Sequence, residues 1–349
     1  MPSAAIPSAA PARRPRPGAI ADWLLFVAAL VLAMIVVGGI TRLTESGLSI
    51  TRWEPVSGAI PPLTAEAWEA QFEAYKQSPQ YEKINQGMSL GEFKDIFFWE
   101  YVHRLLGRLI GLAFALPLAW FAWKRAIPRG YGWKLVALLA LGGLQGFIGW
   151  WMVASGLVDR PEVSHIRLAV HLLTAFLIFG GLVWTALDLR RLAADGQGRP
   201  ARMPTIAIWT LSALGLQFLF GAYVAGLEAG YAFNSWPKMG EQWYPSEAPM
   251  LQPFLANFVD NPIMVQFVHR WLAFVVGAFA VALSVEAWRR GFTVAAAVVL
   301  VSIAVQILLG IATIRTGVEL WIGVAHQGMA ALLLAAILFV AHRLGQGLR

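Results

Sequence analysis

Four of the six histidines in this sequence lie just inside long apolar segments, as two pairs that recur between the halves of the chain. The first pair is His103 and His171, and the second is His269 and His326. An imidazole inside a membrane span is costly and by default marks a functional site. Paired imidazoles on neighbouring helices are what the two axial faces of a haem iron require. The sequence therefore predicts two haem sites, with these histidines as axial ligands of the iron.

Eight apolar stretches must position these histidines. A membrane crossing takes about 20 apolar residues, and the chain is 58% hydrophobic and only 13% charged, about half the charge of a soluble domain. These proportions predict an all-α polytopic membrane protein. The predicted spans are 20–43, 97–124, 131–154, 164–189, 203–227, 261–288, 292–314 and 320–342.

Basic residues gather on one side of an eight-span arrangement: at both chain ends and after the second, fourth and sixth spans. Short loops rich in Lys and Arg face the cytoplasm, so both termini are expected there. The long outer connections, about 44–96 and 228–260, carry most of the acids. The net charge of +7 therefore reflects topology, and no nucleic-acid partner is expected.

The chain contains no cysteine. This excludes thiolate metal sites, covalent haem attachment through C-x-x-C-H and disulfides in the outer loops. Residues 1–19 are rich in Pro, Ala and Arg, which favours a disordered cytoplasmic tail over a fragment of an organellar targeting arm. A bacterial cytoplasmic (inner) membrane is accordingly expected rather than the mitochondrial inner membrane.

The two halves of the chain repeat each other in order. Each half has an even number of spans, so the copies share one orientation, as in parallel duplications. We predict tandem four-helix bundles at 20–190 and 203–349, joined by a cytoplasmic linker at 191–202. The matched pairs are Gly38/Gly221, Glu45/Glu228, Gly47/Gly230, Trp53/Trp236, Pro62/Pro245, His103/His269, Arg104/Arg270, Gly111/Gly277, Gln145/Gln306, Gly149/Gly310, Gly156/Gly317, His171/His326 and Ala175/Ala330.

All four histidines are expected at similar depth, towards the outer face, where two imidazoles of one bundle can hold a flat macrocycle between them. Arg104 and Arg270 follow the first histidine of each pair. Each arginine could pair with a haem propionate or extend to the membrane surface. His165 and His342, at span ends, are predicted to be interfacial.

The halves differ beside the first histidine of each pair. Glu100 lies three residues before His103, whereas Gln266 takes that place before His269, and Arg108 aligns with Phe274. A carboxylate inside a membrane bundle usually serves proton movement or charge stabilisation. We therefore expect chemistry in the first bundle and electron handling in the second; the alternative is a structural ion pair between Glu100 and an arginine. Arg42, Glu45 and Glu228 are assigned to the architecture of the site.

The segments GGITRLTESGLSITRWEPVSGAIPP and FWEYVHRLLGR, followed by HLLTA, NSWPKM and FVHR, resemble the haem A synthase family of respiratory membranes. The resemblance covers nearly the whole chain from about residue 35. It implies eight spans in two four-helix bundles and oxidation of the C8 methyl of haem O to a formyl group, which yields haem A for terminal oxidase assembly. Some relatives carry a cysteine pair in the first outer loop, which this chain lacks.

Carried over by motif, His103 and His171 resemble the ligand pair of the substrate porphyrin, and His269 and His326 resemble the pair that holds a resident haem b. Glu100 matches the family's acid before the first histidine. The implied partners are haem O, a haem O synthase, oxidase assembly factors and a membrane electron donor, and a homo-oligomer stays open.

Two other functions are compatible with paired histidines in membrane spans. A di-haem b-type, quinol-linked cytochrome that only transfers electrons predicts haems near opposite membrane faces and gives no reason for Glu100. A transporter predicts Gly- or Pro-interrupted spans at mid-membrane, whereas these spans are mostly continuous.

Overall fold

The computed structural model describes residues 15–54, 57–158, 160–196 and 200–346, and in this part of the chain eight helices are long and apolar enough to cross a membrane. The predicted spans are thus confirmed as helices. They are α1 (Pro17–Leu43), α4 (Leu90–Trp123), α5 (Gly132–Ala154), α6 (His165–Asp195), α7 (Thr205–Gly226), α9 (Pro262–Arg289), α10 (Thr293–Arg315) and α11 (Leu320–Gly345).

The helix α4 begins seven residues before the predicted span at 97. Ser89 and Glu92 form a reciprocal capping box that satisfies backbone N–H groups at this helix end. The extra turns bury Phe93 and Phe97 against an aromatic cluster that includes Phe72 and Tyr75. The first outer connection is therefore folded, with short helices α2 (Ala65–Lys76) and α3 (Pro79–Lys83).

Two predicted boundaries move at the opposite end of the molecule. The helix α6 continues to Asp195, so 191–195 are helical rather than linker, and Gly196 ends the helix with a positive φ of 67°. The helix α1 begins at Pro17, so 17–19 do not belong to a disordered tail. Of the rest of that predicted tail, residues 1–14 lie outside the described residues.

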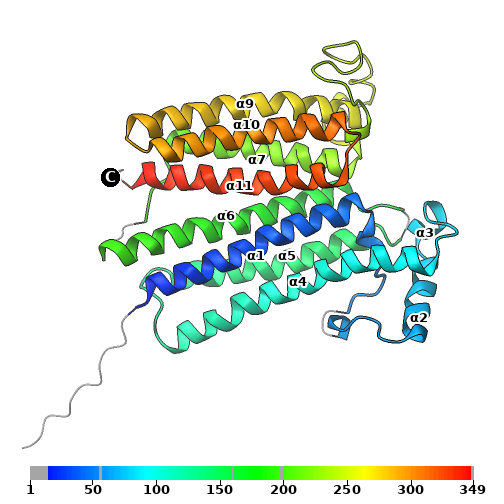
Figure 1. Ribbon diagram of the computed structural model, residues 1–349, viewed down its shortest axis with the longest axis horizontal. Coiled ribbons are helices and arrows are strands. Elements are labelled where there is room, and N and C mark those ends of the chain that lie inside the picture. Colours follow the sequence, from blue (N-terminus) through cyan, green and yellow to red (C-terminus); the bar gives the residue numbers. More distant parts are fainter. Residues whose placement is uncertain (1–14, 55–56, 159, 197–199, 347–349) are drawn as a thin grey trace, which may run out of the picture.

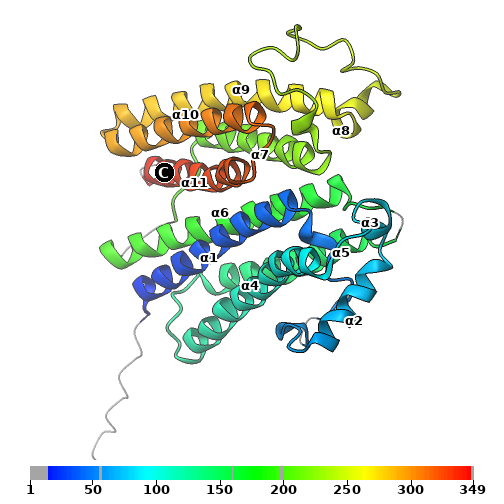
Figure 2. The ribbon, with the colours of Figure 1, turned by 45° about the vertical axis from the view of Figure 1, so that its right-hand side comes forward.

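The spanning helices pack in two groups, one above the other in Figure 1 and Figure 2. In the first half, α1 packs on α4 and α6, and α5 packs on α6. In the second half, α7 packs on α9, and α10 packs on α9 and α11. The start of α1 and the end of α11 lie at one end of the molecule, and the two long connections lie at the other (Figure 1).

The apolar core runs through the layer between the two groups, where α6 packs on α7 and α11, and α1 packs on α11. The most buried side chains of this layer have 0–1% of their surface exposed; they include Ile20, Leu24, Leu182, Leu189, Leu333 and Ile337. Because lipid is as apolar as these side chains, close van der Waals packing rather than hydrophobic burial holds membrane helices together.

A buried polar cluster joins the two halves near the termini. The Asp188 carboxylate contacts His342 Nε2 at 2.9 Å, accepts from the Ala201 backbone N–H at 3.1 Å and lies 3.6 Å from Lys134 Nζ. His342 is at a span end as predicted, but it is only 2% exposed and packs on Trp184. It faces the protein interior because Asp188 holds it there.

Replacing Asp188 with Ala should therefore lower thermal stability, because His342 and the Ala201 N–H would lose a buried acceptor, at a cost of about 2–3 kcal/mol. Thermal unfolding of the detergent-solubilised protein measures this. Glu73→Ala, which removes an exposed contact to Lys76, is the control and should change stability by less than about 0.5 kcal/mol. Equal melting temperatures for the two variants would contradict the prediction.

Candidate functional site

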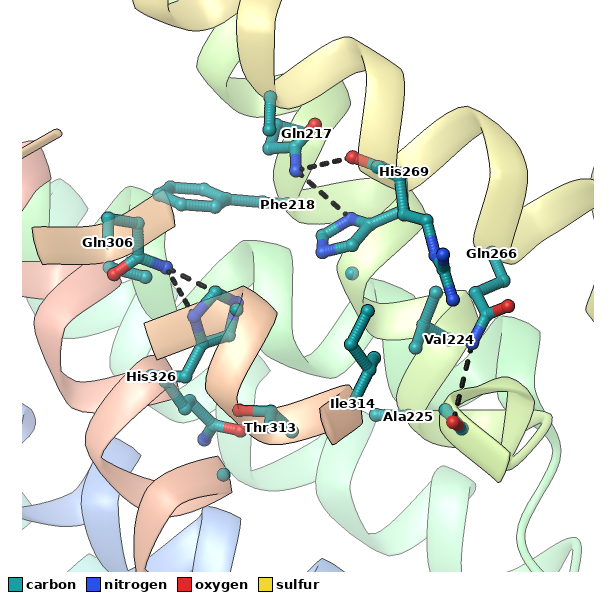
Figure 3. Close-up of a pocket in the computed structure, with 18 of the residues that line it drawn as sticks. Gln217, Phe218, Val224, Ala225, Gln266, His269, Gln306, Thr313, Ile314 and His326 are labelled. Carbon is teal, nitrogen blue, oxygen red and sulfur yellow. Dashed lines mark hydrogen bonds between the residues drawn. The ribbon is translucent and has the colours of Figure 1, made fainter. Parts of the chain in front are cut away.

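His269 on α9 and His326 on α11 face each other across a cavity in the second half (Figure 3). Their ring centres are 6.4 Å apart and the ring planes are almost perpendicular, at 80°. The cavity wall includes apolar side chains such as Val224, Ile314 and Phe274. The structure therefore brings this predicted pair together in an apolar cavity.

The spacing of the two rings fits one metal ion between them. A bond of about 2 Å from imidazole nitrogen to metal on each side, plus the two ring radii, separates the ring centres by roughly 6 Å. Among the described residues no group of three or more His, Cys, Asp or Glu could hold a bare metal ion. A metal here needs equatorial ligands from another source, and a porphyrin supplies four. The donor set thus fits a haem with two axial histidines.

The first-half pair occupies matching elements. His103 lies on α4 and His171 on α6. The helices α1 and α5 each pack against both α4 and α6, as α7 and α10 each pack against both α9 and α11 in the second half. The ring nitrogen Nδ1 of His103 lies 3.4 Å from the Thr41 hydroxyl, and that of His171 lies 3.2 Å from the Gln145 amide nitrogen. Both rings therefore have a polar neighbour on the preceding span.

Each of the four histidine rings also rests against a glycine on the span before it. A methyl group at that glycine would approach the ring carbon Cε1 to 3.3 Å or less, closer than van der Waals contact. The four contacts, as glycine, ring and distance from the built Cβ, are Gly38 with His103 at 3.3 Å, Gly149 with His171 at 3.0 Å, Gly221 with His269 at 3.0 Å and Gly310 with His326 at 2.9 Å.

These glycines are the pairs Gly38/Gly221 and Gly149/Gly310 of the sequence repeat. The sequence showed that they recur but gave them no role, because only the packing reveals that each faces an imidazole. The absence of a side chain lets the ring approach the neighbouring backbone. The four histidines are thus positioned by the same local device.

The two arginines bind the outer loops. Arg270 donates to the carbonyls of Phe233 at 2.7 Å and Ser235 at 2.8 Å. Arg104 donates to the corresponding carbonyls, Ile50 at 2.8 Å and Arg52 at 3.1 Å.

Both guanidinium groups are turned to the protein, so extension to the membrane surface is wrong. Arg270 lines the cavity, is 7% exposed, and its buried Nε has no hydrogen-bond partner among the described residues. This donor could serve an acid group of a ligand. Pairing with a propionate stays a prediction.

Glu100 is 3% exposed and acts with Arg104 in the first half. The hydrogen bonds by which each arginine and its neighbour hold the outer loop are called the loop clamp below. Its carboxylate accepts from Ser49 Oγ at 2.6 Å, from the Ile50 backbone N–H at 2.7 Å and from Arg104 Nη2 at 2.5 Å. The structural ion pair between Glu100 and an arginine, the alternative given in the sequence analysis, is therefore present. It ties the outer loop to α4 next to His103.

Gln266 takes this place in the second half without a charge. Its amide donates to the carbonyls of Gly230 at 3.3 Å and Phe233 at 3.0 Å. The second half therefore holds its loop without a carboxylate, since Arg270 bonds the loop carbonyls directly, while the buried Oε1 of Gln266 has no partner among the described residues. The acid in the first half is an addition to a clamp that works without it.

A charged group joins the halves at the cavity mouth. Arg42 donates to the Ala225 carbonyl at 3.0 Å and pairs with Glu228 at 3.2 Å and Glu162 at 3.7 Å. Burial raises the pKa of Glu162, which lies between α5 and α6, and the nearby Glu228 raises it further, whereas Arg42 lowers it. Arg42, Glu45 and Glu228 line the cavity, which agrees with their assignment to site architecture.

Eight spans, with paired imidazoles held near the end that carries the long loops, define an all-α multi-pass membrane protein, and the spacing of His269 and His326 fits a haem iron. The chain belongs to the COX15-CtaA family, described as cytochrome oxidase assembly protein, whose model matches residues 21–338.

Several curated proteins named haem A synthase are similar to this chain over nearly its full length. The protein of Rhizorhabdus wittichii is 57% identical, with 95% of each chain covered. The protein of Sphingopyxis alaskensis is 50% identical over 99% of this chain and 97% of its own. That of Novosphingobium aromaticivorans is 49% identical over 97% and 98%.

A methyl group at Gly221 should displace the His269 ring and reduce haem retention. We expect Gly221→Ala to purify with several-fold less haem per protein, measured from the absorbance of the extracted pigment. Gly215→Ala is the matched control, because Gly215 is on the same helix and has no atom within 4 Å of its built Cβ. Equal haem content in the two variants would show that this glycine does not position the ring.

Proposed function

We propose that this protein is a haem A synthase, which oxidises the C8 methyl of haem O to a formyl group to make haem A for terminal oxidase assembly. The observation that carries the proposal is the 57% identity, over 95% of both chains, to a protein of that name. The two histidine pairs supply a chemical reason, since this reaction needs a site for the substrate porphyrin and a source of redox equivalents.

We assign the substrate to the first bundle and a resident haem b to the second. The assignment rests on the acid that only the first clamp contains, Glu100 against Gln266. When bound, a haem with both axial positions filled has no open position for oxygen and carries electrons one at a time. His269 and His326 would hold it, with Arg270 beside it.

In the first bundle, His103 and His171 would hold the porphyrin in one orientation, with one methyl group at a fixed position. Such positioning is one source of an enzyme's rate enhancement. The apolar bundle excludes water and buries the isoprenoid tail. Arg104 holds the outer loop on α4. Glu100, with three donors on its carboxylate, lies at the membrane edge, where it can stabilise a developing cation or pass a proton.

The protein is a multi-pass membrane protein, and its relatives are bacterial. We propose the cytoplasmic (inner) membrane, with both termini in the cytoplasm and the two long connections outside, from the distribution of Arg and Lys. Haem O would arrive from a haem O synthase, and haem A would leave to oxidase assembly factors. A membrane electron donor must supply the resident haem, and a homo-oligomer stays open.

Pigment extraction from the purified protein tests the function. We expect haem b together with haem O or haem A in one preparation. Haem b alone would favour the electron-transfer cytochrome, and no haem at all would overturn both functions.

Ligand variants test the division of roles. His269→Ala should remove haem b, because one axial bond and its orienting ring are lost, while His171→Ala should keep haem b and lose haem O and haem A. Reversed-phase chromatography of the extracted pigments distinguishes the three haems. The reverse pattern would exchange the roles of the two bundles.

Glu100→Gln should abolish conversion of haem O to haem A, since it removes the acid that the second clamp lacks. Because Gln266 and Arg270 build a working clamp without an acid, the variant should fold and retain haem b. The measurement is the haem A to haem O ratio, with haem b content as the control for folding. Undiminished haem A would remove Glu100 from the mechanism.

A further inference from the structure

Two isoleucines of α10 line the cavity between His269 and His326. Ile303 and Ile307 lie one helical turn apart, so they share a face of the helix, and Ile303 is only 6% exposed. The Cδ1 atom of Ile307 lies 3.9 Å from the position that a Cβ would take on Gly277 of α9. The isoleucines therefore fill the seam, the line of contact between α9 and α10, beside the predicted haem.

The matching positions of the first half carry no side chains. The sequence repeat that pairs Gln145 with Gln306 places Gly142 and Gly146 where α10 has its two isoleucines. A Cβ built on either glycine, or on Gly111, which matches the glycine of α9, comes within 4 Å of no neighbouring helix among the described residues. All three glycines are exposed. The seam between α4 and α5 is therefore open where its counterpart is filled.

Both seams begin beside a ligand ring. Gln306 Nε2 is 3.3 Å from His326 Nδ1, and Gln145 Nε2 is 3.2 Å from His171 Nδ1. The residue that follows each glutamine is the isoleucine or the glycine by which the seams differ. A substituent on the rim of a porphyrin held by these histidines thus has free space at the seam of the first half, whereas it meets isoleucine side chains in the second.

The two porphyrins of the proposed function differ in such a substituent. Haem O carries a long isoprenoid tail on its rim, where haem b carries a short vinyl group. Extra carbon atoms forced into a packed site displace its side chains, which is unfavourable. An open seam that faces lipid offers the tail surroundings as apolar as the tail itself. The filled seam therefore favours the porphyrin without a tail, and the open seam accepts the one that has it.

We propose that Ile303 and Ile307 are specificity residues that exclude a porphyrin with an isoprenoid tail from the second bundle, and that the open seam at Gly111, Gly142 and Gly146 admits the tail of haem O to the first. The proposal rests on the proposed function, from which it takes the two porphyrins. It gives a steric reason, independent of the acid in the first clamp, for the substrate to occupy the first bundle.

The second site is tested alone in the His171→Ala protein, whose first bundle should hold no pigment. Ile303→Ala with Ile307→Ala is added to the full-length chain, produced in cells that make both haem b and haem O. The ratio of haem O to haem b, measured by reversed-phase chromatography of the extracted pigment, should rise several-fold over the His171→Ala protein. Leu308→Ala, on the same helix but at a side chain that is 64% exposed, is the matched control and should leave the ratio unchanged.

The first site is tested by the reverse exchange in the otherwise wild-type protein. Gly142→Ile with Gly146→Ile should fill the open seam, so haem O and haem A should fall several-fold, while haem b in the second bundle is retained and reports folding. Gly132→Ile adds the same side chain elsewhere on α5, where no neighbouring helix of the described chain lies within 4 Å. This control should keep all three haems.

A rise of haem O in the isoleucine variant and a fall of haem O and haem A in the glycine variant support the proposal. Haem b alone or no pigment in the isoleucine variant, or undiminished haem O and haem A in the glycine variant, overturns it. The isoleucine variant decides the matter if the glycine variant does not fold, because it only shortens side chains. Wild-type protein that yields neither haem O nor haem A would instead overturn the proposed function, so the two failures are distinguishable.

Discussion

The contact on which the site depends is that between each histidine ring and the span preceding it. A buried imidazole must have its ring nitrogens paired and its ring held at one angle, since neither lipid nor water is there to do so. In all four cases a glycine admits the ring and a polar side chain one turn or more away contacts it. This contact fixes the register of α1 on α4, α5 on α6, α7 on α9 and α10 on α11.

The arrangement of the halves follows from the same contact. Each histidine lies on one helix and rests against a glycine on the preceding helix. Two histidines therefore need four helices, and each half contains four spanning helices. Between the halves, Phe176 stacks on Phe218 with centroids 4.1 Å apart, and Gln327 donates to the Ile35 carbonyl at 2.6 Å. Gln327 follows His326, and Ile35 is one turn before Gly39, so the second ligand pair lies directly against the first half.

The sequence was sufficient to predict the spans and to pair His269 with His326, because hydropathy and a polar residue inside an apolar segment are local signals; their role as haem ligands stays a prediction. It was insufficient wherever the partner is backbone or far away. Arg104 and Arg270 bind loop carbonyls, which no pattern of side chains displays. The amide of Gln217 lies beside the His269 ring, but Gln217 aligns with a methionine, so the sequence repeat did not indicate this contact. The early start of α4 depends on aromatic packing with α2, a contact across the first outer connection.

The clearest difference between the halves is the acid at Glu100, and its surroundings argue for chemistry over structure. Burying a carboxylate in a membrane protein is costly, and here three donors offset that cost. The second half shows that the same loop can be held on the same helix by Arg270 and a neutral amide. A structural need alone would therefore be met by glutamine in both halves. The acid is present only in the half that we propose holds the substrate, one helical turn from His103.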